Sequence, residues 1–341
     1  MGKIKSFLTR KGVIISPKTY FIDCMSAMAQ GLFASLLIGT IFSTISKYTG
    51  IELFETINTY AKEATGAAIG VAIALSLKAP SLVVFSSASV GLMANLLHGA
   101  GPLGAFFAVI VACEIGKIVS KETRVDILVT PAATILAGAL TSLAVCSYIG
   151  RLMAWLNGFI TTATELHPLL MGIVISVVVG IVLTLPISSA ALCASIPITS
   201  IAGGAAVAGC CAQMIGFAVI SFRENRWNGL LAQGLGTSML QMGNIVRKPL
   251  IWIPATLASA ITGPLSTMLF KLECNGVAAG MGTCGLVGPI GVLQATDEKD
   301  LLFWVGFVLI CFILPALLSL VFNEIMRKTG LIKTGDMKLD L

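Results

Sequence analysis

The stretch 231–290 constrains the fold most strongly, because it is apolar throughout yet interrupted at short intervals by Gly, Pro and small polar residues. An ordinary membrane-spanning helix needs about 20 apolar residues without interruption. A backbone that leaves helical geometry inside a bilayer must be buried in protein or face a wet cavity, since lipid satisfies neither N–H nor C=O groups. Transporters hold their cargo at such broken helices. The stretch therefore predicts a transporter-like protein.

The composition of the whole chain supports a membrane location. Of its 341 residues, 56% are hydrophobic and only 11% are charged, whereas soluble domains carry roughly 25% charged residues. Several apolar segments are too short, or too rich in Gly and Pro, to be simple spans. We therefore predict an all-α polytopic membrane protein with about ten transmembrane helices and one or two re-entrant hairpins. The apolar segments are 21–47, 65–77, 81–97, 101–116, 127–149, 168–185, 187–220, 229–246, 249–270, 276–296 and 301–323.

Basic residues directly flank the first and the last apolar segments, which predicts that both termini are cytoplasmic and that the number of crossings is even. The polar connections 117–124 and 221–226 are predicted cytoplasmic turns for the same reason. A nucleic-acid-binding tail is a weaker interpretation of these charges. The flanking basic residues are Lys3, Lys5, Arg10, Lys11, Lys18, Arg327, Lys328, Lys333 and Lys338.

Cysteine and glycine usage indicates packing rather than chemistry. The nine cysteines include no C-x-x-C pair, so neither a disulfide framework nor a zinc site is predicted, and we expect small buried side chains. Gly and Ala clusters at 66–70 and 203–209 predict close helix packing. No cofactor and no metal ion is expected.

A short repeat marks one expected break. Pro186-Ile187-Ser188-Ser189 recurs as Pro197-Ile198-Thr199-Ser200. Each proline removes an amide donor and breaks a helix, and each hydroxyl can satisfy a freed carbonyl. The repeat predicts either the tip of a hairpin that enters the membrane or two kinked helix ends.

Three regions give the chain a family resemblance that extends over about 21–323. The region 128–160 is similar to a helix that enters from a cytoplasmic loop and continues as an amphipathic segment. Pro-Ile-Ser-Ser-Ala-Ala at 186–191 lies where the family has Pro-Val-Asn-Lys-Ala-Ala. The region 236–254 keeps both prolines of the family's Asp-Pro-Leu-Arg-Val-Ile-Pro in register. The chain thus resembles the membrane-spanning IIC component of bacterial phosphotransferase sugar permeases of the fructose-like kind.

The chain departs from this family at the residues that carry its chemistry. The acidic residue of the family's Gly-Ile-Thr-Glu-Gly motif falls on Met239, its Asn-Lys pair on Ser188 and Ser189, and its Pro-His-Gly-Gly histidine on Thr283. The chain is therefore similar to the divergent IIC-like proteins described as toxin-gene regulators.

The resemblance implies an elevator-type IIC fold, a homodimer in the bacterial cell membrane, a sugar-like cargo and soluble IIA and IIB phosphocarrier proteins as possible partners. By itself the chain has no self-contained catalytic site, so it is at most the membrane acceptor component of a sugar phosphotransferase. Its histidines, His98 and His167, are expected at turns. The expected parts are a cytoplasmic segment 1–20, a scaffold and dimerisation half 21–165, a core transport domain 166–300, a last helix 301–326 and a cytoplasmic tail 327–341.

Uncharged hydrogen-bonding side chains stand at the expected breaks. Such groups suit a polyol or another neutral polar solute, because each pairs with a hydroxyl without stranding a charge. They also suit the capping of broken helix ends. The predicted substrate-binding residues are Ser188, Ser189, Thr237, Ser238, Gln241, Asn244 and Thr283.

Two pairs of charged residues have alternative interpretations. Arg247 and Lys248 are expected at the cytoplasmic mouth, because a charge at the bilayer centre costs at least about 2.5 kcal/mol. There they either anchor the helix or attract a phosphorylated partner or an anionic solute. Glu114 is expected to pair with Lys117, three residues later, rather than to be a proton-linked carboxylate.

These patterns favour a IIC-like transporter that binds and translocates a small polar solute by an elevator movement. One alternative is a IIC-derived membrane sensor or regulator without turnover, suggested by the missing acidic and histidine residues. The other is a carrier of an organic anion or amphiphile, suggested by Arg247, Lys248 and Met239. No nucleic-acid partner is expected.

Overall fold

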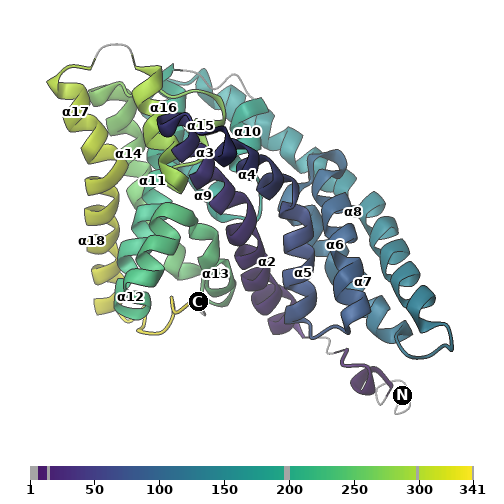
Figure 1. Ribbon diagram of the computed structural model, residues 1–341. Helices are drawn as coiled ribbons and strands as arrows, with labels where there is room; N and C mark the ends of the chain where they lie inside the picture. The colour runs from purple at the N-terminus through teal and green to yellow at the C-terminus, as the bar shows by residue number, and fades with distance from the viewer. Residues whose placement is uncertain (1–6, 14–15, 196–199, 297–298, 340–341) are drawn as a thin grey trace. The chain divides into compact units, whose positions relative to one another are not determined.

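The structure is a computed structural model that describes residues 7–13, 16–195, 200–296 and 299–339 (Figure 1). The described residues form helices and no strand. Seven of the helices are long and apolar enough to cross a membrane, and three shorter ones are also apolar. The predicted class, an all-α polytopic membrane protein, is confirmed. The long helices are Thr19–Thr49, Ser81–Gly99, Gly101–Val119, Asp126–Thr164, Ser200–Ile220, Pro249–Phe270 and Leu301–Lys328, and the shorter ones are Thr65–Ser76, Pro168–Thr184 and Cys284–Ala295.

The chain divides into two compact units. Unit 1 contains Met1–Gly39 and Glu55–Met153, and unit 2 contains Thr40–Phe54 and Ala154–Leu341. The functional division expected from the sequence, with boundaries at 20, 165, 300 and 326, stays a prediction, as do the re-entrant hairpins and the elevator movement.

Unit 1 is built mainly from uninterrupted helices that pack through small residues. A methyl group added to Gly70 would lie 2.1 Å from the carbonyl oxygen of Ser87 on the neighbouring helix. Gly66 and Gly91 face each other in the same way, so the predicted close packing is confirmed here. The helices of unit 1 are η1 (Thr19–Asp23), α2 (Cys24–Leu32), η2 (Phe33–Leu37), α5 (Thr65–Ser76), α6 (Ser81–Leu96), η3 (Leu97–Gly99), α7 (Gly101–Val119) and the first part of α8 (Asp126–Thr164); α3 (Ile38–Thr49) and α4 (Glu52–Glu63) run across the division between the units.

The charged pair that was expected in unit 1 is present. The Lys117 ammonium lies 3.1 Å from the Glu114 carboxylate, and its side chain is only 2% exposed. The ammonium also donates a hydrogen bond to the Leu77 carbonyl oxygen at 3.2 Å. The predicted ion pair is therefore confirmed. The cysteines are likewise buried and free, as expected.

Unit 2 is organised around α11 (Ser200–Ile220), which packs against α9 (Pro168–Thr184), α14 (Ile253–Pro264) and α18 (Leu314–Lys328). Gly209 lets α11 approach α9 closely, because an added methyl group would lie 1.9 Å from the Ser176 carbonyl oxygen. The other elements of unit 2 are α10 (Ser189–Ser195), α12 (Phe222–Leu231), η4 (Ala232–Gly236), η5 (Ser238–Gln241), α13 (Met242–Arg247), η6 (Pro249–Trp252), η7 (Leu265–Phe270), α15 (Gly276–Ala279), η8 (Cys284–Leu286), α16 (Val287–Ala295), α17 (Leu301–Val308) and η9 (Leu309–Ile313).

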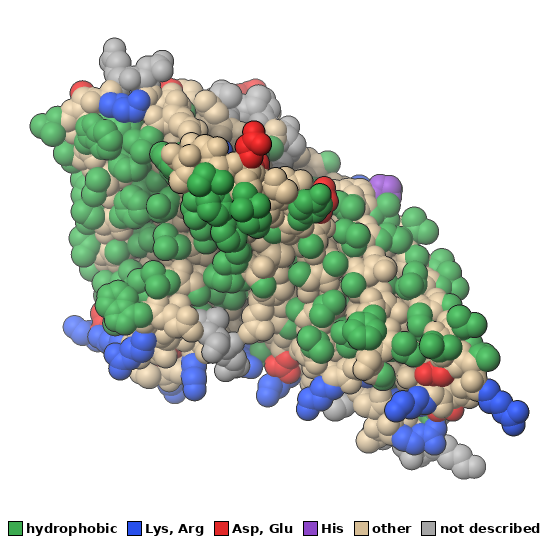
Figure 2. Space-filling view, in the orientation of Figure 1, with side chains coloured by type: hydrophobic (Ala, Val, Ile, Leu, Met, Phe, Trp, Pro, Cys, Tyr) green, Lys and Arg blue, Asp and Glu red, His purple; other side chains and the backbone are tan. Residues whose placement is uncertain are grey.

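The outer face of α17 and α18 has the surface of a membrane helix. Figure 2 shows hydrophobic side chains along these helices and Lys and Arg side chains gathered at the end near α12. Leu317, Val321 and Ile325 of α18 are each more than half exposed. Exposed apolar residues bounded by basic ones are typical of a helix that crosses a bilayer and ends at its surface.

The observed helix boundaries can be compared with the expected segments at three places. The connection predicted at 221–226 follows the end of α11 and contains one helical turn of α12 between the non-helical residues Ser221 and Arg226. The apolar segment 127–149 continues as one helix to Thr164. Within the apolar segment 187–220, α10 and α11 lie on either side of 196–199, and Ser200 at the start of α11 has a left-handed φ of 58°. Pro197, Ile198 and Thr199 of the repeat lie outside the described residues.

Candidate functional site

The first break in unit 2 follows α9. The helix ends at Thr184, and Leu185 has extended backbone angles of φ −70° and ψ 157°. Pro186 explains this, because a proline disfavours the helical region for the residue before it and cannot donate an amide hydrogen bond. The chain becomes helical again at Ser189. The sequence correctly predicted this break.

The second break lies between α12 and α13. Thr237 is extended, with φ −159° and ψ 142°, and separates η4 from η5. The Thr237 hydroxyl accepts a hydrogen bond from the Met239 main-chain N–H at 3.1 Å, so this side chain caps the short helix that follows. α13 ends at Lys248, the residue before Pro249. This break, too, was predicted.

A buried hydrogen bond joins the two breaks. The hydroxyl oxygens of Thr184 and Ser238 are 2.8 Å apart, and both residues are fully buried. Gln213 of α11 extends this contact, because its amide oxygen accepts hydrogen bonds from the Trp252 indole N–H at 3.0 Å and from the Thr184 hydroxyl at 3.4 Å. Its amide nitrogen donates to the Thr256 hydroxyl at 3.3 Å. We name Thr184, Gln213, Ser238, Trp252 and Thr256 the break network.

Of these residues, the sequence analysis identified only Ser238. Gln213 had a visible signal, since it is a lone carboxamide within an otherwise apolar helix. A buried carboxamide needs partners, which makes such a residue a marker of a polar cluster. Thr184 and Trp252 had no comparable signal, because hydroxyls and indoles are common in membrane helices.

The loop 280–285 contacts both breaks. The Ser189 hydroxyl donates to the Gly280 carbonyl oxygen at 2.7 Å, and the Thr283 hydroxyl donates to the carbonyl oxygen of Gly234. Gly282 allows the loop to take this path, because its φ of +52° is a left-handed conformation that favours glycine. The structure thus brings Ser189, Ser238 and Thr283 into one region of unit 2. Ser188, which is half-buried, lies at the first break beside Ser189.

Gln241 and Asn244 contact the C-terminal segment 333–339 instead. The Gln241 amide nitrogen donates to the Gln233 side-chain oxygen and to the Met337 carbonyl oxygen, both at 3.0 Å. The Asn244 amide nitrogen donates at 2.9 Å to the Gln241 side-chain oxygen and to the Lys338 carbonyl oxygen. No pattern in the sequence predicted that this segment covers the second break.

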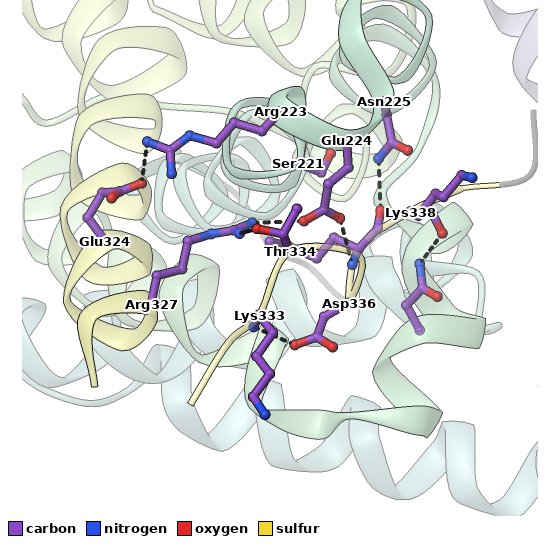
Figure 3. Close-up of polar contacts among 12 residues, drawn as sticks. Ser221, Arg223, Glu224, Asn225, Glu324, Arg327, Lys333, Thr334, Asp336 and Lys338 are labelled. Carbon is purple, nitrogen blue, oxygen red and sulfur yellow. Dashed lines mark hydrogen bonds and ion pairs between the residues drawn. The ribbon is translucent and has the colours of Figure 1, made fainter. Parts of the chain in front are cut away.

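Ion pairs surround this segment (Figure 3). Lys248 pairs with Asp336, and the buried Arg327 pairs with Glu224 at 3.0 Å. Burial raises the pKa of Asp336, but hydrogen bonds from the Lys248 ammonium and the Lys333 main-chain N–H outweigh it, so the pKa lies below its ordinary value. Arg247 is exposed. Of the two basic residues expected at the mouth, Lys248 therefore has a partner within the chain.

The two histidines occupy turns, as predicted. His98 is exposed in the turn Leu97–Gly99, and His167 caps the start of α9 by accepting a hydrogen bond from the Leu169 N–H at 3.4 Å. Neither belongs to the break network. The breaks of unit 2 bring together uncharged hydrogen-bond donors and acceptors, which can bind hydroxyl groups.

Comparison with known protein families found a match over most of the chain. Residues 22–339 match the family described as phosphotransferase system, EIIC. No curated protein and no solved structure matched the chain. The match extends over both units and includes both breaks, the loop 280–285 and the C-terminal segment. The chain therefore belongs to the EIIC family, the membrane sugar-permease component of the phosphotransferase system.

Proposed function

We propose that this EIIC protein binds a small, neutral, sugar-like solute at the two breaks of unit 2 and translocates it by an elevator movement of the part that carries them. The observation that carries the proposal is the 2.8 Å hydrogen bond between the Thr184 and Ser238 hydroxyls. It brings together two interrupted helices, which is where membrane transporters place their binding sites.

The chemistry of the break network suits a hydroxyl-bearing solute. A solute hydroxyl both donates and accepts, so it can replace the contact between Thr184 and Ser238 and leave each side chain with a partner. Because these groups are uncharged, an ionic solute would lose its hydration without gaining a counter-charge. Ser188, Ser189, Thr237 and Thr283 lie next to this network and are the further proposed contacts. Gln241 and Asn244 are proposed contacts only after the C-terminal segment has moved.

Membership of the family implies soluble IIA and IIB phosphocarriers as partners in general. We propose that these partners meet the end of unit 2 that carries α12 and the C-terminal segment, because its basic residues indicate the cytoplasmic side. On this proposal both termini are cytoplasmic, the chain lies in the bacterial cell membrane, and it acts as a homodimer whose interface lies in unit 1.

Uptake by proteoliposomes tests the proposal. Purified full-length protein is reconstituted, and the uptake of radiolabelled hexoses, pentoses and hexitols is measured with and without phosphorylated IIA and IIB proteins of the same organism. We expect saturable uptake of at least one of these solutes. Ser238→Ala should reduce it about tenfold, because the solute loses a buried hydrogen-bond partner. Ser142→Ala is the matched control, since Ser142 is equally buried and bonds only to its own helix.

A folded protein that takes up none of these solutes under either condition contradicts transport. Organic anions belong in the same panel, because competition by anions but not by sugars would support the anion-carrier alternative. The ion pair between Lys248 and Asp336 weighs against that alternative, since it occupies one of the two basic residues on which the alternative rests.

A second candidate function is a membrane sensor or regulator without turnover. It is favoured by Met239, which stands where the family has a carboxylate, and by the C-terminal segment that occupies Gln241 and Asn244. This function predicts that deletion of the gene changes the expression of other genes and leaves every solute uptake rate unchanged.

A further inference from the structure

We propose that the C-terminal segment 333–339 is a latch that holds the second break closed, and that it must detach before Gln241 and Asn244 can contact a ligand. The inference rests on the proposed function only for the identity of that ligand. The latch itself is described by its contacts within unit 2, which join it to α12, α13 and α18 (Figure 3).

The latch is held through its main chain. Asn225 of α12 donates to the Met337 carbonyl oxygen and accepts from the Leu339 N–H, both at 2.8 Å. The Met337 N–H donates to the Glu224 carboxylate at 2.8 Å. Gln241 and Asn244 bind the Met337 and Lys338 carbonyl oxygens from the other side. Side chains of α12 and of the second break thus hold the turn at 334–337 and the two residues after it between them.

Two adjacent residues anchor the middle of the latch. Met337 is completely buried, and Asp336 pairs with Lys248, the residue that ends α13. The Asp336 carboxylate also accepts the Lys333 N–H at 2.6 Å, which closes the turn at 334–337. A buried apolar side chain gives the latch its affinity, whereas a partly exposed ion pair is easily exchanged with water. The latch is therefore specific and also releasable.

The backbone next to the grip is strained. Arg226 has φ 51° and ψ −150°, a conformation that non-glycine residues rarely adopt, and it follows directly after Asn225. Such a conformation persists only when surrounding contacts impose it. The bonds from Glu224 and Asn225 to the latch are contacts of that kind. Release of the latch would let the backbone relax at Arg226, which follows the α12 residue that pairs with α18. The second break, further along the chain, is therefore the part that responds.

A reversible cross-link tests whether the latch must move. Lys248→Cys and Asp336→Cys place two thiols where the ion pair was, and the cysteines of the natural chain are buried and so poorly accessible to reagents. A bis-methanethiosulfonate linker should bridge the two thiols within one chain. We expect the cross-linked protein to lose at least about tenfold in uptake rate and to regain it after reduction, because a locked closed state removes the competent population.

The matched control is the pair Arg223→Cys and Glu324→Cys. These residues form a 3.1 Å ion pair between α12 and α18 close to the latch but outside it. The same linker should leave uptake unchanged at this pair. Equal inhibition by both cross-links, or full activity of the Lys248–Asp336 cross-link, would overturn the proposal. A cross-link that joins two chains would overturn the intramolecular latch.

A second measurement does not depend on transport. In the full-length protein, Met337→Cys should react slowly with a bulky maleimide, and Asp336→Asn should accelerate the reaction about tenfold by favouring the open state. Lys338→Cys, at an exposed position, should react rapidly with or without Asp336→Asn. Hydrogen exchange at the Met337 and Leu339 amides gives the same comparison without a cysteine substitution.

The two measurements separate the two proposals. Faster labelling and exchange in Asp336→Asn, together with an absence of uptake for every solute, would leave the latch standing and reject transport. Uptake that the cross-link does not affect, with unchanged labelling and exchange in Asp336→Asn, would reject the latch and leave transport standing.

Discussion

The uninterrupted helices of unit 1 and the breaks of unit 2 use similar polar side chains in opposite ways. In unit 1, Ser142 donates to the Gly138 carbonyl oxygen and Thr134 to that of Thr130, each within its own helix. At the breaks, Thr184 meets Ser238 and Ser189 meets Gly280, each across separate elements. A hydroxyl that bonds within its helix moves with that helix. A hydroxyl that bonds between elements exchanges partners when the elements move or a solute arrives.

The two regions show how polar side chains at the proposed site differ from polar side chains elsewhere. Ser142 and Ser238 are both fully buried in apolar surroundings, so neither burial nor residue type distinguishes them. What distinguishes Ser238 is a backbone that leaves helical geometry beside it and therefore frees its hydroxyl from the preceding turn. Close packing of helices through small residues stabilises unit 1, whereas hydrogen bonds between separate elements connect the breaks of unit 2.

The largest effect on stability should come from overpacking a helix contact in unit 1. Gly70→Ala places a methyl group 2.1 Å from the Ser87 carbonyl oxygen, and overpacking of this kind costs about 1–3 kcal/mol or more. We expect a lower melting temperature and less monodisperse protein in detergent. Gly158→Ala is the control, because open space surrounds Gly158 and alanine favours a helix by about 0.5–1 kcal/mol. Equal melting temperatures for the two variants would contradict the claim that close helix packing stabilises unit 1.

A smaller loss should follow from Gln213→Leu in unit 2. Leucine has a similar size but leaves the Trp252 indole N–H without its partner, whereas the Thr256 hydroxyl keeps its bond to the Trp252 carbonyl oxygen. We expect a destabilisation of about 2 kcal/mol, since an unsatisfied buried polar group costs about 1–3 kcal/mol. Met214→Leu, at the neighbouring buried position, should cost less. Denaturation of the two purified variants measures the difference, and a Gln213→Leu protein as stable as Met214→Leu would show that the network contributes nothing.

The direct comparison of the two hydroxyls should give a smaller but more informative difference. Ser238→Ala should cost about 1 kcal/mol, and Ser142→Ala within about 0.5 kcal/mol, because only Ser238 leaves a partner in another element. In a double-mutant cycle, Ser238→Ala and Thr184→Val should be coupled by about 1 kcal/mol. Additive effects would mean that the 2.8 Å contact does not link the two breaks.

The smallest effect concerns acidic pH. The lowered pKa of Asp336 means that its ion pair with Lys248 stabilises the folded chain above the unfolded pKa of about 3.9 and is lost as pH falls through the folded value. The difference in melting temperature between the natural chain and Asp336→Asn should be constant from about pH 8 to 5 and should shrink below about pH 4. A difference that changes near neutral pH would point to another group.

The sequence was a good guide where local chemistry determines structure. Pro186 and the Gly-Thr-Ser run at 236–238 correctly predicted the two breaks, because proline and glycine act on their own backbone. The sequence also predicted the close packing at Gly70 and Gly209 and the pair formed by Glu114 and Lys117.

The features that the sequence did not indicate depend on distant main-chain atoms. Gln241 and Asn244 were predicted to contact a solute, but here they bind carbonyl oxygens of Met337 and Lys338. A carbonyl oxygen is present at every residue and carries no sequence signal. The partners of Glu224 and Asn225 in the connection 221–226 were missed for the same reason, since they are main-chain N–H groups more than a hundred residues away.

The affinity of the protein for its transported solute tests the central claim most directly, namely that the two joined breaks form the solute site. Binding of the radiolabelled solute to the purified natural chain, to Ser238→Ala and to Ser142→Ala should be measured at equilibrium under identical conditions. We predict an affinity about tenfold weaker for Ser238→Ala, corresponding to about 1.4 kcal/mol, and an unchanged affinity for Ser142→Ala. The same affinity in all three proteins would contradict the account.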